Sequence, residues 1–164
     1  MKIVRFAACA VCVIAGIVGC QSASKERSTL MYMEDSVTRL LPSFLESAVA
    51  DSSLTYKGPL VMRQGRVRNE TTSIGNECVE KFGEQFAAGL SKCGVARFVP
   101  SGSGEQGGKT LVPTATWEGK LVQKDSRAND GRFQHELTLT ISIVDITTGE
   151  NLWHDERCIV ITHK

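Results

Sequence analysis

The sequence predicts an α+β, two-layer domain in which a mainly antiparallel sheet of about four to five strands carries helices on one face. Two segments in the first half have apolar residues at the three- and four-residue steps of an amphipathic helix. A later segment alternates apolar and polar residues, which is typical of a strand with one buried face. The last three predicted strands follow one another closely and are expected to form an antiparallel meander.

Two helices account for the apolar periodicity. The first is predicted to begin near Met31 and to use an apolar stripe of Val37, Leu40, Leu41, Phe44, Leu45, Ala48 and Val49. Pro42 lies inside this stripe and is expected to kink or interrupt the helix, because proline removes a backbone donor. The second helix is predicted from about Asn76 to Lys92, with Gly94 as its end. Its apolar face carries Val79, Phe82, Phe86, Leu90 and Cys93.

Five strands are predicted around these helices, at residues 60–67, 95–99, 114–124, 133–143 and 152–161. The third strand places Ala115, Trp117 and Leu121 on one face, which suits packing against the helices. A polar turn is expected at residues 69–73, a hairpin loop at 125–131, and a tight turn with glycine at 147–150.

The N-terminal segment, residues 1–19, has the features of a signal peptide. Lys2 and Arg5 provide a positive start, and an apolar or small-residue run of thirteen follows, from Phe6 to Val18. This run is too short to cross a bilayer as a helix and suits a cleaved export signal.

The end of that segment, Ile17-Val18-Gly19-Cys20, resembles the lipobox of bacterial lipoproteins. The resemblance implies cleavage before Cys20 and lipidation of that cysteine. Gln21 follows, and the absence of aspartate there favours sorting to the periplasmic face of the outer membrane. Residues 20–30 then form a short tether, and residues 31–164 form the globular domain.

Charge and composition exclude several classes of partner. Removing Lys2 and Arg5 with the signal leaves 17 basic against 18 acidic residues, a net charge near −1. The domain therefore lacks the basic field that nucleic acid requires, and membrane attachment is expected to come from the lipid.

A glycine-rich stretch at residues 101–110, SGSGEQGGKT, comes close to a phosphate-binding loop. However, Ser103 stands where the motif needs glycine. Residues 111–117 predict a strand, whereas a phosphate loop requires a helix at that point. We therefore expect no nucleotide to bind.

No motif for catalysis or a cofactor is present, and we expect a protein that is not an enzyme. His135 and His163 are expected to lie near each other on the last two strands, but only Cys158 is a further ligand type nearby. This is too few for a metal site, so none is predicted.

Three cysteines remain after processing and lipidation: Cys78, Cys93 and Cys158. Cys78 and Cys93 lie on one predicted helix with a rise of about 22 Å between them, so they cannot bond each other. We expect three buried, unreactive thiols.

Three stretches carry a resemblance to a known family: Asn69-Glu70-Thr71, residues 95–99, and residues 137–153. With the order of elements, they resemble the LpoB family of lipoprotein activators of penicillin-binding proteins. Family members typically have Asn-Arg-Thr after the first strand, where this chain has Glu70, and often have a helix where this chain has its glycine-rich stretch. The resemblance covers residues 31–164 apart from that loop region.

The resemblance implies a non-catalytic domain that docks on a bifunctional penicillin-binding protein and stimulates peptidoglycan synthesis. The tether from Gln21 to Leu30 extends at most about 35 Å, whereas family members that act across the periplasm use long linkers. This favours an alternative, a subunit of an outer-membrane secretion or surface assembly related to the curli-secretion lipoproteins.

Four residues are candidates for contact with the partner. Arg66, Arg68 and Asn69 form a polar cluster near the end of the first strand. Trp153 is either an aromatic anchor at an interface or part of the apolar face of the sheet, and core packing is the favoured interpretation.

Overall fold

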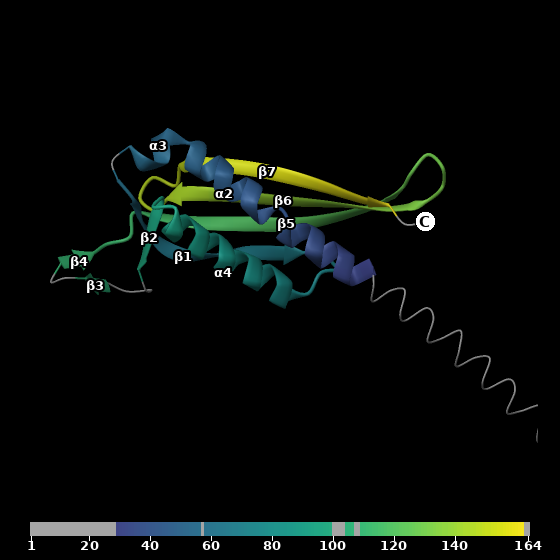
Figure 1. Ribbon diagram of the computed structural model, residues 1–164, viewed down its shortest axis with the longest axis horizontal. Coiled ribbons are helices and arrows are strands. Elements are labelled where there is room, and N and C mark those ends of the chain that lie inside the picture. Colours follow the sequence, from purple (N-terminus) through teal and green to yellow (C-terminus); the bar gives the residue numbers. More distant parts are fainter. Residues whose placement is uncertain (1–28, 57, 100–103, 107–108, 163–164) are drawn as a thin grey trace, which may run out of the picture.

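The computed structural model describes residues 29–56, 58–99, 104–106 and 109–162 (Figure 1). Residues 29–38 form an N-terminal helix, which is followed by α2 (Leu41–Ala50), α3 (Ser52–Thr55) and α4 (Asn76–Lys92). The strands are β1 (Leu60–Glu70), β2 (Ala96–Val99), β3 (Gly104–Gln106), β4 (Lys109–Leu111), β5 (Ala115–Arg127), β6 (Phe133–Asp145) and β7 (Asn151–Thr162).

The main sheet has five strands in the order β2-β1-β5-β6-β7. β5, β6 and β7 pair antiparallel, as predicted for the final meander. β1 pairs parallel with both β2 and β5, so the sheet is mixed, although most of it is antiparallel. The helices pack on one face (Figure 1), which confirms the predicted α+β class.

Pro42 interrupts the N-terminal helical region, as predicted. The helix of residues 29–38 ends in a turn at Arg39 and Leu40, and α2 begins at Leu41 with the proline in its first turn. A proline is tolerated there because the first backbone N–H groups of a helix have no partner within the helix. The interruption leaves Met33 and Val37 on one side, and Phe44 and Ala48 on the other, all buried in the same core.

The core lies between α4 and the inner face of the sheet. Phe86 of α4 is fully buried and makes an edge contact with Trp117, with ring centroids 5.5 Å apart. It also stacks on Trp153 at 6.3 Å. Aromatic side chains bury large apolar areas, so this group joins the helix layer to β5 and β7. Phe82 makes a similar edge contact with Phe44 of α2.

β1 contains an irregularity that reverses its inward and outward faces. The pairing of β1 with β5 shifts register between Arg63 and Arg66. Met62 before the shift is fully buried, and Val67 after it packs against the core. Gly65 lies in the shifted segment, where a Cβ atom would sit 1.6 Å from the carbonyl oxygen of Trp117. Only glycine allows the strands to approach this closely.

The largest differences from the predicted elements lie at three places. β1 continues through Glu70, where a polar turn was predicted from Asn69. β5 continues to Arg127, so the loop after it is shorter than residues 125–131. The small antiparallel pair of β3 and β4 was not predicted. Residues 1–28, which include the predicted signal peptide, Cys20 and most of the tether, lie outside the described part of the chain.

Among the residues that the structure describes, no helix is long and apolar enough to cross a membrane.

Candidate functional site

The face of the sheet opposite the helices carries two of the predicted partner-binding residues. The register shift in β1 turns Arg66 and Arg68 toward this face, and both are exposed. Arg66 lies beside Glu118 of β5, and Arg68 lies beside Lys120. We call this surface the uncovered face, because the helices pack on the other side of the sheet (Figure 1).

A shallow groove of about 290 Å³ crosses the uncovered face; it is lined by Arg66, Arg68, Glu118, Gly119, Lys120, Thr140 and Ser142. Its lining has three basic side chains and one acidic one. Lys120 pairs with Glu70 at 3.0 Å, and Arg68 lies 3.9 Å from the same carboxylate. Arg66 has no acidic partner at ion-pair distance among the described residues. The groove therefore presents the guanidinium of Arg66, whose N–H groups suit a carboxylate.

The β6 and β7 side of the uncovered face is a row of hydrogen-bonded polar side chains. Ser142 Oγ lies 3.0 Å from His154 Nδ1. Beside it, Thr140 Oγ1 donates to Glu156 Oε2 at 3.2 Å. His154 was not considered a candidate from the sequence, although alternation along β7 places it on the polar face. These side chains extend the polar surface of the groove across β6 and β7.

Asn69 does not share this surface. Its Nδ2 atom donates to the Ile74 carbonyl and to Asn76 Oδ1, each at 2.9 Å. Its Oδ1 atom accepts from the backbone N–H and the hydroxyl of Thr71, at 3.1 and 2.8 Å. Thr71 Oγ1 in turn accepts from the Ile74 N–H. Asn69 thus fixes the loop between β1 and α4, and the sequence prediction that grouped it with Arg66 and Arg68 was wrong about its placement.

Trp153 lies inside the core with 6% of its surface exposed. It faces the helix layer and stacks on Phe86, so it matches the core interpretation. A role in partner binding stays a prediction, and in this structure Trp153 presents little surface for it.

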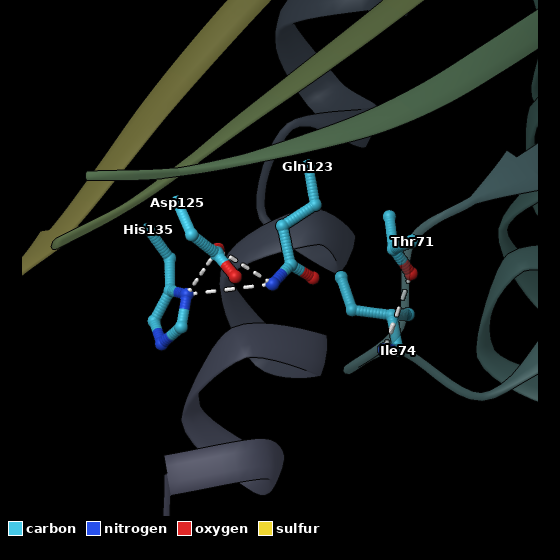
Figure 2. A network of polar contacts seen from close by, with 5 residues as sticks. All are labelled: Thr71, Ile74, Gln123, Asp125 and His135. Carbon is cyan, nitrogen blue, oxygen red and sulfur yellow. Dashed lines mark hydrogen bonds and ion pairs between the residues drawn. The ribbon is translucent and has the colours of Figure 1, made fainter.

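A second polar cluster, shown in Figure 2, joins β5 and β6 on the helix side of the sheet. Gln123 Nε2 donates to Asp125 Oδ1 at 2.8 Å, and His135 Nδ1 lies 2.7 Å from the same oxygen. These two contacts, with that of Gln123 first, lower the pKa of Asp125 below the usual range of an aspartate. Phe133 packs edge-on against His135, with centroids 5.0 Å apart. The cluster links β5 and β6 near the loop that joins them.

The cluster has no metal-binding arrangement. Among residues 29–56, 58–99, 104–106 and 109–162, no group of three or more His, Cys, Asp or Glu side chains is placed to hold a metal ion. His163, the other histidine of the sequence prediction, lies outside these residues.

The cysteines are free thiols, but the prediction that all three are buried was wrong. Cys93 and Cys158 are exposed, and Cys78 is half-buried. Cys93 directly follows the last residue of α4, and Cys158 lies on the face of β7 that points away from the helices. Burial, and after it the Glu34 carboxylate, raises the pKa of the Cys78 thiol, which keeps it protonated.

Comparison with known proteins finds distant similarities of structure. No protein family and no curated protein matches the sequence. The solved LpoB C-terminal domain from Salmonella enterica is 15% identical, with 74% of this chain and 93% of that domain covered and a TM-score of 0.44. A lipoprotein from Neisseria meningitidis is 16% identical, with 63% and 84% covered and a TM-score of 0.39.

A PelC dodecamer from Paraburkholderia phytofirmans is 15% identical, with 65% of this chain and 70% of that chain covered and a TM-score of 0.39. All three are distant similarities of structure, and their identities and TM-scores establish neither a family nor an activity for this chain.

Proposed function

We propose that this chain is a lipid-anchored, non-catalytic lipoprotein that binds and activates a penicillin-binding protein in the manner of the LpoB family. The observation that carries the proposal is the presence, in one sequence, of a lipobox at Cys20 and the LpoB-like stretch of residues 137–153. That stretch forms most of β6, the turn at Gly149 and the start of β7. The anchor places the domain in the outer membrane, facing the periplasm.

The docking surface in this proposal is the uncovered face of the sheet. Its groove is lined by polar side chains of β1, β5 and β6, among them Arg66 and Arg68, and His154 and Glu156 of β7 continue this polar surface. Such a surface suits a partner with an acidic patch. The groove is mainly basic, so acidic groups of a partner strengthen binding and basic groups weaken it. The shallow, open shape suits a protein surface better than an enclosed small molecule.

A crosslinking pull-down from intact cells, with the lipidated protein as bait and mass spectrometry as readout, tests the partner. We expect recovery of a bifunctional penicillin-binding protein. The double variant R66Q/R68Q is expected to lose most of this recovery. The matched control K81Q/K92Q removes the same charge from the exposed side of α4 and is expected to keep it. Recovery of outer-membrane proteins alone contradicts the proposal.

A second function is favoured by the short tether and by the edges of the sheet. The outer edge of β7 pairs with no strand among the described residues, and β1 is paired with β2 only over Leu60–Arg63. Open edges can add strands from another chain. The alternative is therefore a subunit of an outer-membrane secretion or surface assembly, built by edge-to-edge contact.

Oligomeric state separates the two functions. Light scattering of the purified lipidated protein in detergent is expected to give a monomer for the activator and a closed oligomer for the assembly subunit.

A further inference from the structure

Three consecutive exposed side chains lie near the first described residue of the N-terminal helix. Leu30, Met31 and Tyr32 have 40%, 68% and 57% of their surface exposed. The buried residues of the same helix, Met33 and Val37, already supply its contact with the core. Neighbouring exposed apolar side chains that the core does not use are candidates for a contact surface.

A fourth exposed apolar residue lies at the same end of the molecule. Figure 1 shows the start of the N-terminal helix and the β5–β6 hairpin together at one end of the long axis, with α3 at the opposite end. Phe133 is the first residue of β6 beyond that hairpin loop and is 46% exposed. Leucine, methionine, phenylalanine and tyrosine side chains can enter the interfacial region of a bilayer, where the tyrosine hydroxyl stays in contact with water.

The short segment between Cys20 and the N-terminal helix limits how far this end of the domain can lie from a lipid anchor. Only eight residues, 21–28, separate Cys20 from Thr29, the first described residue of the N-terminal helix. Nine residue steps span at most about 30 Å whatever their conformation. A lipid on Cys20 would therefore keep the described start of the N-terminal helix within about 30 Å of the bilayer.

We propose that Leu30, Met31, Tyr32 and Phe133 form a membrane-contact surface that rests on the lipid bilayer carrying the anchor. The contact is apolar, because the mature chain has a net charge near −1 and is not drawn to anionic lipid. The inference uses the lipidation of Cys20 from the proposed function but does not depend on the identity of the protein partner.

The methionines of the chain provide the test. After removal of Met1, the chain retains Met31, Met33 and Met62. Met31 lies in the proposed surface, whereas Met33 and Met62 are 1% and 0% exposed. The mature lipidated protein is labelled with ¹³C-methyl methionine, inserted into bicelles, and measured by NMR before and after addition of a nitroxide-labelled phospholipid. Met31 is expected to lose several-fold more signal than Met62.

A matched pair of variants locates the contact. The variant L30Q/Y32S is expected to reduce the loss at Met31, while Y56S, at the exposed end of α3, is expected to leave it unchanged. If the protein is acylated but the Met31 and Met62 signals decrease equally, the membrane contact is wrong. The penicillin-binding protein hypothesis is not affected by that result. If mass spectrometry of the intact protein shows no acyl chains, Cys20 is not lipidated and the membrane-contact inference fails. The pull-down then still tests the protein partner.

Discussion

At the scale of single residues, the candidate site shows how neighbouring polar residues of one strand can have opposite roles. Arg66 and Arg68 project into the groove because the register shift at Gly65 reverses the alternation of β1. Asn69, one position later, points the other way and is used within the fold. The Asn-x-Thr pattern that supports the LpoB resemblance is therefore, in this chain, a hydrogen-bonded loop anchor.

The first residue-scale prediction concerns this loop. Asn69→Ala removes four hydrogen bonds and leaves partly buried backbone groups unpaired. We expect it to lower the free energy of unfolding by about 1–3 kcal/mol, measured by urea denaturation. Thr72→Ala, at an exposed position in the same loop, is expected to change it by less than about 0.5 kcal/mol. Equal effects of the two variants contradict the anchoring role.

At the scale of elements, the amphipathic helix and the alternating strand were predicted well, because in each the pattern and the environment agree. α4 has the bounds expected from its apolar face. β6 begins where it was predicted to and ends slightly later than predicted, at Asp145. The end of β1 was missed because a polar strand facing solvent looks like a loop in sequence. The bulge at Gly65 was missed because it depends on the position of Trp117, which is distant in sequence.

The second prediction concerns the hairpin of β5 and β6. The Asp125 carboxylate is stabilised in its charged form by Gln123 and His135, so its pKa is lower in the folded than in the unfolded chain. Its contribution to stability is present above the unfolded pKa and is lost as the pH falls through the folded pKa. Because its side chain is 44% exposed, we expect the contribution to be below about 1 kcal/mol.

An NMR titration checks this prediction directly. Gln123→Ala is expected to raise the pKa of Asp125 toward the usual range of an aspartate, because it removes the largest cause of the shift. Lys124→Ala, whose side chain points to the other face of β5, serves as the control. Superimposable titration curves for Gln123→Ala and the parent chain show that the contact of Gln123 does not set this pKa.

At the scale of the whole molecule, two layers are joined by a few aromatic contacts. Phe86 touches both Trp117 and Trp153, so it connects α4 with two strands that are not neighbours in the sheet. Both tryptophans were expected in the core because alternation placed them on the apolar face. Their common contact with one phenylalanine could not be predicted, since it depends on how the helix crosses the sheet.

The third prediction follows from this junction. Phe86→Ala is expected to lower the free energy of unfolding by about 3–5 kcal/mol, because the cavity lies between two rigid rings. Gln85→Ala, exposed on the same helix, is expected to be nearly neutral. Urea denaturation followed by tryptophan fluorescence measures both variants. A loss below about 1 kcal/mol for Phe86→Ala contradicts the junction.

The parallel pairing of β1 with both of its neighbours has a consequence for the order in which the chain acquires its structure. β5, β6 and β7 meet through short turns, so they assemble from local contacts. β1 precedes them in synthesis, yet Met62 pairs with Ala115 and Leu60 with Ala96, much later in the chain. Contacts between distant positions form slowly. The apolar start of β1 is therefore expected to stay unpaired until β2 and β5 are in place, which leaves it open to contact with other chains during folding.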